Sequence, residues 1–276
     1  MNLKTFFSKT NDLDSEQVRK FMADHLAEEY VLLDVRQPKE YEAEHLPGAV
    51  LAPMKELAEK LKELDPQKPV IVYCASGGRS TIAARFLSGK GFQEVYNLSG
   101  GIKKWFGRKA TGPEIQGLEL LDSDGDYQSG IVLAYALEDG LQKFYARLAA
   151  LAEGAEEARL LERLAGFEDK HKAWLMEEYR HLVEDRSAIP EIGILDDTME
   201  GGRSVSQFLA RVRPEFLTLE HIFELAMMFE TQAMDLYSRL AHQASEPTVK
   251  DLFYRLIEEE NMHLGFLEKE YNRLMV

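Results

Sequence analysis

Residues 70–80 read VIVYCASGGRS and contain the one cysteine of the 276-residue chain. The apolar, β-branched run before Cys74 predicts a buried strand, and the Ala- and Leu-containing segment Ser80–Lys90 predicts a helix. Cys74 is therefore expected at a strand end, on a glycine-containing loop that leads into a helix. Backbone N–H groups and the helix dipole favour an anion there, so this thiol should ionise more readily than a free one.

Two interpretations of this cysteine are open. Buried structural cysteines are common in proteins. Here, however, Gly77, Gly78 and Arg79 all lie within five residues of the thiol, and Arg79 adds a fixed positive charge. These neighbours favour a reactive cysteine over a structural one.

The length and composition indicate two domains in a reducing compartment. The length itself favours two domains, and an apolar fraction of 45% is enough to form cores. A single cysteine excludes a disulfide framework and a thiolate metal cluster. No stretch approaches a membrane span, and the N-terminus lacks a long apolar run. We therefore expect a cytoplasmic protein without a membrane partner.

The net charge of −15 is unevenly distributed. Residues 1–112 carry 17 Lys and Arg against 15 Asp and Glu, whereas the remainder carries 16 against 33. This asymmetry supports the two-domain division. The acidity of the second half argues against nucleic acid as a partner.

The first 110 residues predict an α/β domain with a parallel sheet, because strands alternate with helices. Asp14 and Gln17 have the spacing of a capping box at a helix start. The predicted elements are a helix to Leu26, a buried strand Tyr30–Arg36 ended by Pro38, a turn and short strand over 45–51, a helix Met54–Leu64, the strand Val70–Tyr73, the helix Ser80–Lys90, a strand Glu94–Leu98 and a helical turn Ile102–Phe106.

Four stretches in this half resemble the rhodanese (sulfurtransferase) family, over about residues 10–108. They are Leu33–Arg36, Glu40-Tyr41 with His45–Ala49, the loop Cys74–Ser80, and Asn97–Ile102 with Trp105. The resemblance implies that Cys74 carries sulfane sulfur as a persulfide, with Arg79 as the second catalytic residue. It also implies a substrate cradle formed by Ala75, Ser76, Gly77, Gly78 and Ser80.

Two features of the loop bear on its substrate. Four residues separate Cys74 from Arg79, where phosphatases and arsenate reductases of related fold usually have five, so the ring is tighter and suits sulfur better than phosphate. Many rhodaneses place Arg directly after the cysteine, where this chain has Ala75. With one cation fewer, we expect weak affinity for thiosulfate, a small-molecule or protein persulfide as donor, and an external thiol as acceptor. Asp34 and Arg36 are expected to be structural.

The second half repeats itself. Residues 111–127, rich in Gly, Pro and Asp, predict a linker, and an offset of 92 residues then superposes two helix pairs within residues 128–276. The predicted helices span 129–152, 156–185, 218–243 and 246–274. A long crossover, Arg186–Leu217 with Gly201-Gly202 and Pro214, joins the pairs, as in four-helix bundles with one long connection.

The repeat selects a set of metal-ligating residues. Glu-x-x-His places both side chains on one helix face, and four of the seven histidines have this motif: His45, His171, His181 and His263. The offset makes Glu168-x-x-His171 equivalent to Glu260-x-x-His263, each with one Glu on the preceding helix, Glu138 or Glu230. His45 and His181 are outside this pattern and are expected to be surface residues.

A Glu from each of two helices with Glu-x-x-His from the other two is the known di-metal carboxylate pattern of four-helix bundles. Four buried carboxylates would cost several kcal/mol each if unpaired, whereas two divalent cations would neutralise them. Carboxylate and imidazole suit iron or manganese, and the absence of thiolate argues against a structural zinc site.

This half resembles the rubrerythrin branch of the ferritin-like superfamily, over about residues 128–274. The resemblance implies a non-haem di-iron site that reduces peroxide or reacts with dioxygen, and a homodimer. Rubrerythrins commonly carry a four-cysteine rubredoxin domain, which one cysteine cannot build, so the electron donor would be external.

Gly140 lies mid-helix at a cost of about 1 kcal/mol relative to Ala, and predicts a bend or a small opening beside the site.

Two classes of function follow. The first is a sulfurtransferase that carries persulfide on Cys74, fused to a di-iron oxidoreductase of peroxidase or oxidase type. The alternative is a metal-dependent dimeric sensor of redox state or sulfide, without significant turnover. Iron storage has no support beyond the site itself, because nothing in the chain indicates a cage.

Overall fold

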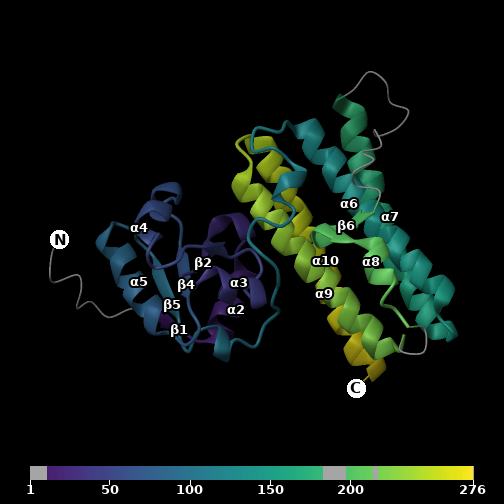
Figure 1. Ribbon diagram of the computed structural model, residues 1–276, viewed down its shortest axis with the longest axis horizontal. Helices are drawn as coiled ribbons and strands as arrows, with labels where there is room; N and C mark the ends of the chain where they lie inside the picture. Colours follow the sequence, from purple (N-terminus) through teal and green to yellow (C-terminus); the bar gives the residue numbers. More distant parts are fainter. Residues whose placement is uncertain (1–10, 183–196, 214–216, 276) are drawn as a thin grey trace. The chain divides into compact units, whose positions relative to one another are not determined.

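The computed structural model describes residues 11–182, 197–213 and 217–275. The chain divides into two compact units, Met1–Gln116 and Gly117–Val276, and the division falls inside the segment 111–127 expected to be a linker (Figure 1). Each unit is described by itself. Residues 1–10, the last three residues of the expected helix 156–185, and parts of the expected crossover (186–196 and 214–216, with Pro214) lie outside the described residues.

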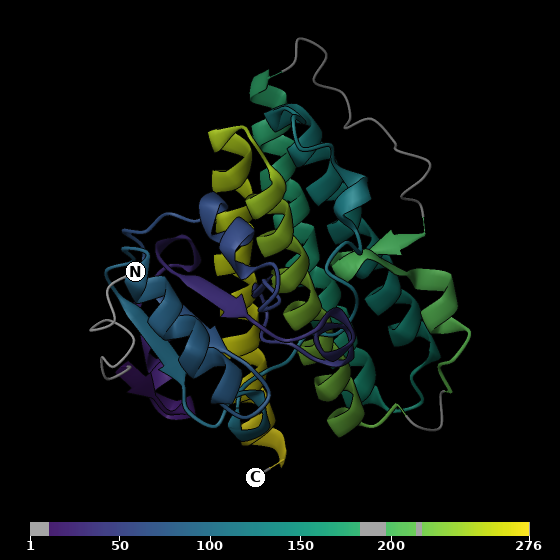
Figure 2. The ribbon, with the colours of Figure 1, turned by 60° about the vertical axis from the view of Figure 1, so that its left-hand side comes forward.

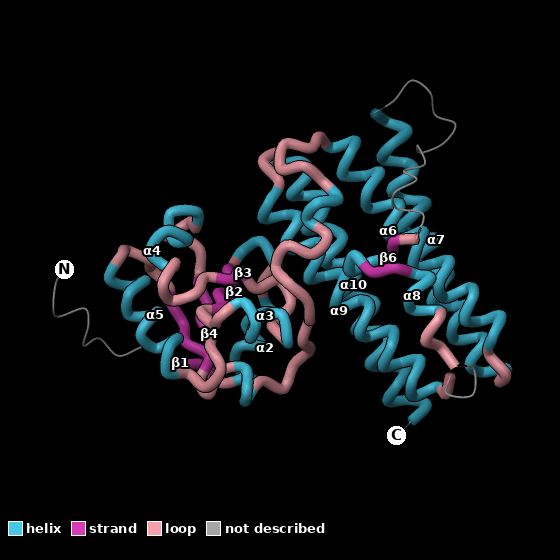
Figure 3. The backbone as a smooth tube through the Cα atoms, viewed as in Figure 1, coloured by secondary structure: helices cyan, strands magenta, loops and turns pink. Residues whose placement is uncertain are grey.

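The first unit is an α/β domain with a parallel sheet, as predicted. Its five strands lie in the order β1-β5-β4-β2-β3, and every neighbouring pair is parallel (Figure 3). The strands are β1 (Asn11–Leu13), β2 (Val31–Asp34), β3 (Val50–Leu51), β4 (Val70–Tyr73) and β5 (Val95–Leu98).

Both faces of this sheet are covered. Successive side chains of a strand point to opposite faces. Accordingly, Leu33 and Val72 belong to one buried cluster, whereas Leu32 and Ile71 belong to another. All residues of β2 and β4 are buried, which is why these strands are apolar at nearly every position. The helices of the unit are α2 (Ser15–Asp24), α3 (Pro38–Ala43), α4 (Leu57–Lys60) and α5 (Gly78–Gly89).

Several local predictions for this unit were incomplete. Pro38 does end the strand region, but it also occupies the first position of α3, where its fixed φ suits a helix. The polar strand β1 was missed, since its order comes from pairing with β5. The expected helix Met54–Leu64 is shorter, with α4 followed by a 3₁₀ turn Leu61–Glu63. The helix after Cys74 begins two residues early, at Gly78.

The second unit is helical, as predicted, with two antiparallel helix pairs of a four-helix bundle (Figure 2). The first pair is α6 (Tyr127–Leu151) and α7 (Ala155–Leu182), and the second is α9 (Leu219–Gln243) and α10 (Pro247–Met275). Each pair is joined by a short turn. Asp126 and Thr218 cap α6 and α9 by accepting the N–H groups of Ser129 and His221.

The crossover between the pairs packs against α6 and corrects one prediction. Its described part holds a small antiparallel pair, β6 (Thr198–Met199) and β7 (Arg203–Ser204), followed by α8 (Val205–Leu209). A Cβ atom at Gly140 would overlap the carbonyl oxygen of Thr198 and lie 2.8 Å from the Cα of Met199. The expected opening beside Gly140 is therefore wrong: the glycine admits the backbone of β6.

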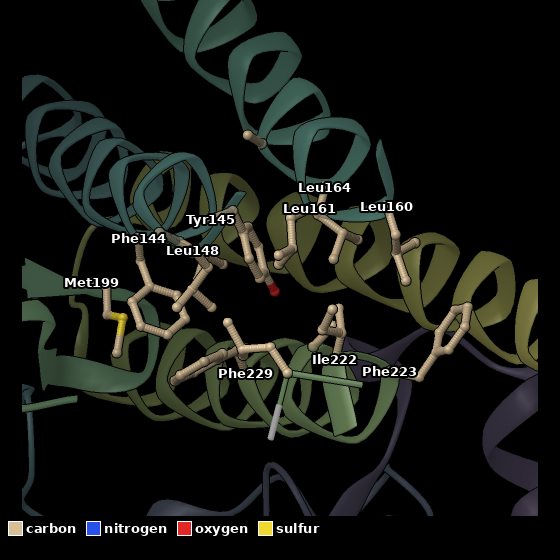
Figure 4. Packing of buried hydrophobic residues seen from close by; sticks show 14 of the residues in the cluster. Phe144, Tyr145, Leu148, Leu160, Leu161, Leu164, Met199, Ile222, Phe223 and Phe229 are labelled. Carbon is tan, nitrogen blue, oxygen red and sulfur yellow. The ribbon is translucent and has the colours of Figure 1, made fainter. Parts of the chain in front are cut away.

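An aromatic cluster fills the bundle core beside this crossing (Figure 4). The rings of Phe144 on α6 and Phe229 on α9 meet edge to face at 5.1 Å between centroids. Phe208 on α8 meets the same Phe229 ring at 5.0 Å. The crossover thus adds side chains to the core between the two helix pairs.

Candidate functional site

Cys74 lies where the sequence places it, between the carboxyl end of β4 and the start of α5. The residue is buried, with 1% of its surface exposed. The loop turns at Gly77, whose φ of +99° is left-handed, and a Cβ there would lie 3.3 Å from the backbone nitrogen of Gly100. A side chain at Gly77 would therefore be strained by its backbone conformation and crowded by Gly100.

Hydrogen bonds converge on the sulfur of Cys74. The Gly77 N–H donates to Sγ at 3.1 Å, and the Ser80 hydroxyl donates at 3.5 Å. Burial alone raises the pKa of Cys74, but hydrogen bonds from the Ser80 side chain and from backbone N–H groups of Ser80, Ser76 and Gly77 outweigh it. The pKa of the thiol is lowered as a result, which favours the thiolate that acts as a nucleophile.

Of the remaining two residues of the expected cradle, Ala75 helps to hold the loop in place and Gly78 begins the next helix. The Ala75 carbonyl accepts the Lys103 N–H at 3.1 Å, and the Cys74 carbonyl accepts the Ile102 N–H at 2.9 Å. Gly78 is the first residue of α5. A Cβ at Gly101 would overlap the Cys74 carbonyl oxygen, so this glycine lets the following turn support the loop.

Arg79 is bound by a carboxylate that sequence reasoning did not assign to the site. Its Nη1 and Nη2 donate to Oε2 and Oε1 of Glu40, both at 2.7 Å. The hydrogen bond from Arg79 lowers the pKa of Glu40 to about 2, against a smaller opposing effect of burial. The Glu40 hydrogen bond raises the pKa of Arg79, and the charge of Cys74 contributes in the same direction. Arg79 is thus a paired cation near the thiol.

Two further residues of the loop region are structural. Arg36 binds Asp34 through Nη2 at 2.7 Å, and both side chains are buried, as expected for a structural pair. The prediction that His45 is a surface residue was wrong, because it is 1% exposed and its ring stacks on Tyr41 at 3.7 Å. Spacing to Glu42 could not reveal this, since the fold of the loop buries His45. His181 is exposed, as expected.

In the second unit, the six residues selected by the repeat come together inside the bundle. They form three overlapping groups of three residues, and within each group the ligand atoms lie within 4.8 Å of one another. The four carboxylates are fully buried. The residues are Glu138 from α6, Glu168 and His171 from α7, Glu230 from α9, and Glu260 and His263 from α10.

Both histidines turn Nδ1 toward these carboxylates. His171 Nδ1 lies 2.9 Å from Glu138 and 3.7 Å from both Glu168 and Glu260. His263 Nδ1 lies 3.3 Å from Glu260 and 3.6 Å from Glu230. The two imidazole rings stack at 4.6 Å between centroids. Burial alone lowers the pKa of His171, but the charge and hydrogen bond of Glu138 raise it overall.

The cluster is suited to binding metal cations. Among the described residues, neither carboxylate oxygen of Glu230 accepts a hydrogen bond, although both are buried, and His263 Nδ1 is likewise without a hydrogen-bond partner. A buried charge in such surroundings costs several kcal/mol unless a cation offsets it. Four carboxylates and two imidazoles are a donor set that suits iron or manganese.

Tyr237 is a residue of this site that sequence reasoning missed. Its hydroxyl donates to Glu138 Oε1 at 2.9 Å from seven residues beyond Glu230 on α9. Tyr145 has the equivalent position after Glu138 in the first repeat, and both tyrosines are buried. The recurrence of Tyr at one offset is the signal that would have found it.

Comparisons with known proteins match the two units separately. A family model described as a rhodanese-like domain matches residues 16–108, and one described as rubrerythrin matches residues 130–271. The first unit is 40% identical over 75 residues to the thiosulfate sulfurtransferase GlpE of Pseudomonas syringae pv. syringae, covering 27% of this chain and 71% of that protein.

Other similar proteins also align with the first unit. A sulfurtransferase of Allochromatium vinosum is 36% identical over 95 residues, covering 34% of this chain and 87% of that protein. The uncharacterized protein YqhL of Bacillus subtilis is 44% identical over 77 residues, 28% of this chain, and the chain spans 61% of its length. A solved structure described as rhodanese with anions from E. coli is 36% identical, covering 30% of this chain and 99% of that one, at a TM-score of 0.29.

Proposed function

The chain belongs to the rhodanese-like family over residues 16–108 and to the rubrerythrin family over residues 130–271, and from this we propose an enzyme with two chemical centres. Cys74 carries sulfane sulfur as a persulfide. The six-residue cluster of the bundle holds two iron ions and reduces peroxide or dioxygen. None of the described helices has the length and apolar character needed to span a membrane.

The sulfur step is a transfer between thiols without net oxidation. The Cys74 thiolate attacks the outer sulfur of a donor persulfide, so a new S–S bond forms on Cys74 as the donor's S–S bond breaks and the donor leaves as a thiolate. An external thiolate then removes the outer sulfur and regenerates the Cys74 thiolate. The second step needs an external acceptor, because the chain has no other cysteine.

The observation that carries this proposal is the convergence of the Gly77 N–H and the Ser80 hydroxyl on Sγ. These donors stabilise negative charge on the sulfur, both on the attacking thiolate and on a departing one. Since Ala75 supplies no cation and Arg79 is paired with Glu40, a doubly charged donor gains little attraction. We therefore infer that persulfides are better donors than thiosulfate.

In the bundle, the described residues form a buried, negatively charged site. Glu138, Glu168, Glu230 and Glu260 would offset the charge of two divalent ions, with His171 and His263 as nitrogen ligands. The Tyr237 hydroxyl holds one Glu138 oxygen and so restricts the orientation of that carboxylate. Iron held by these residues would supply the redox chemistry that reduces peroxide or dioxygen. An external donor must supply the electrons for this reduction.

One experiment tests each centre. Purified wild-type protein and Cys74→Ala are each incubated with glutathione persulfide or with thiosulfate. The transfer of sulfur to a thiol acceptor is then measured. We expect transfer from the persulfide, slower transfer from thiosulfate and none in the variant; full transfer by Cys74→Ala would refute the persulfide site. For the bundle, elemental analysis should find two metal ions per chain, and loss of both in Glu168→Ala/Glu260→Ala.

A sensor without turnover is the second candidate, and the burial of Cys74 favours it. With 1% of the residue exposed, access to the thiol is narrow, which slows repeated exchange. Steady-state assays separate the candidates, because an enzyme cycles many times with persulfide or peroxide, whereas a sensor reacts once. The homodimer implied by the rubrerythrin resemblance stays a prediction, which light scattering of the purified protein checks.

A further inference from the structure

One of the differences between the two helix pairs lies directly beside the metal-binding cluster. The 92-residue offset makes Phe167 on α7 equivalent to Glu259 on α10, and each immediately precedes the Glu of a Glu-x-x-His motif. The Phe167 ring stacks on His263 with 4.9 Å between centroids. The Glu259 carboxylate instead lies 4.0 Å from Nε2 of His171. Each side chain thus reaches across to the histidine of the other helix, but with different chemistry.

The two nitrogens of His171 face different groups. Nδ1 points into the cluster, 2.9 Å from Glu138, whereas Nε2 points outward to Glu259. The Glu259 side chain is 33% exposed, in contrast to the buried carboxylates inside. It therefore has the freedom to approach an Nε2–H donor more closely than the present 4.0 Å.

His263 lacks this outer partner. In the described part of the chain, its ion pairs run through Nδ1 alone, to Glu230 and Glu260. The Phe167 ring instead lies against one face of the His263 imidazole, stacked at 23° between ring planes, and offers no strong hydrogen-bond acceptor. The two histidines, which the repeat makes equivalent, are thus supported by different groups.

A metal-ligating histidine commonly donates its second ring N–H to a carboxylate, which fixes the ring and makes it a stronger ligand. We propose that Glu259 is the positioning residue for His171 and that the two metal subsites are therefore inequivalent. The subsite that contains His171 binds its metal ion more tightly than the other. This inference rests on the di-metal function proposed above. It assigns Glu259 a role outside the ligand set itself.

Cobalt(II) titration of the metal-free protein tests the proposal. The visible absorbance of bound Co(II), with a competing chelator, gives the two dissociation constants. We expect two unequal constants for the wild type. Glu259→Gln should weaken the tighter step by about 10- to 100-fold and leave the weaker step unchanged. Glu268→Gln, with the same charge change at an exposed site of the same helix, should alter neither.

Two variants at Phe167, the position equivalent to Glu259, separate this effect from a loss of folding stability. Phe167→Glu should tighten the weaker step and bring the two constants closer, whereas Phe167→Gln should not; circular dichroism confirms helix content in each. Two equal constants in the wild type, or a Glu259→Gln effect that is absent or equal on both steps, would overturn the inference. A wild type that binds no Co(II) would instead remove the di-metal function itself.

Discussion

The guanidinium of Arg79 and the carboxylate of Glu40 form two hydrogen bonds of 2.7 Å each across 39 residues of sequence. The pair joins the first turn of α5, just after the Cys74 loop, to α3. Arg79 is therefore held in one orientation near the thiol, but much of its charge is compensated. Both the acidity of Cys74 and the stability of this unit should respond to the pair.

Removing either partner should change the pKa of Cys74 in opposite directions. Glu40→Gln leaves the Arg79 charge uncompensated, which stabilises the thiolate and lowers the pKa by up to about 1 unit. Arg79→Gln raises it by a similar amount. The ultraviolet absorbance of the thiolate against pH measures this cleanly, because no other cysteine titrates. Lys62→Gln, at an exposed site, is the control. An unchanged pKa of Cys74 in Arg79→Gln would contradict a role of Arg79 in stabilising the thiolate.

The same pair should stabilise the first unit only above acidic pH. The pKa of Glu40 is lowered from 4.5 to about 2 in the folded chain. The stabilisation is therefore fully present above pH 4.5 and is lost as the pH falls toward 2. Since both side chains are 35% exposed, screening limits its contribution to about 1 kcal/mol.

Urea unfolding followed by Trp105 fluorescence, in a Trp174→Phe background, isolates the first unit. The free energies of unfolding of the parent and of Glu40→Gln should differ by about 1 kcal/mol near neutral pH. That difference should shrink as the pH falls below 4.5. A difference that is the same at every pH would rule out this ionic contribution.

Gly140→Ala should destabilise the bundle despite the better helix propensity of alanine. The new methyl group would overlap the Thr198 carbonyl, so β6 must move, at a cost of about 1–3 kcal/mol. Gly166→Ala on α7 is the matched control, since a Cβ there meets nothing within 4 Å and should stabilise by about 0.5–1 kcal/mol. Thermal unfolding compares them, and equal effects would contradict the close packing of β6.

Metal binding should stabilise the second unit. At 100 times its dissociation constant, a bound ion adds about 2.7 kcal/mol to the stability of the folded state. We expect manganese(II) to raise the unfolding temperature and a chelator to reverse it. In Glu230→Gln/Glu260→Gln the metal-free protein should be more stable than wild type, because fewer charges are buried. An equal response to manganese in this variant would argue against the cluster as the metal site.

The fold class could be predicted because each half carries a repeated local pattern. Buried β-branched runs such as Val70–Tyr73 mark a parallel sheet, and the 92-residue offset marks two equivalent helix pairs. The missed elements lack such a pattern. β1 begins with Asn11 and Asp12 and owes its order to β5, while Pro38 is both a strand terminator and a helix starter.

The candidate sites were predictable to the extent that their residues are near in sequence or related by the repeat. The Cys74 loop and the six cluster residues meet these conditions, and their roles stay predictions. Glu40 does not, because its contact with Arg79 depends on the tertiary fold. Tyr237 does recur with Tyr145 at the repeat offset, but its contact with Glu138 likewise depends on the tertiary fold. His45 was misplaced for the same reason.

The composition of the donor groups has a consequence for the folding of the bundle. Two of the three groups combine side chains of the first helix pair with side chains of the second, as Glu138 and His171 do with Glu260. An ion held by such a group would act as a reversible cross-link that closes a chain loop of about 90 residues. By restricting the entropy of the unfolded chain as a disulfide does, it would couple the two hairpins into one cooperative unit.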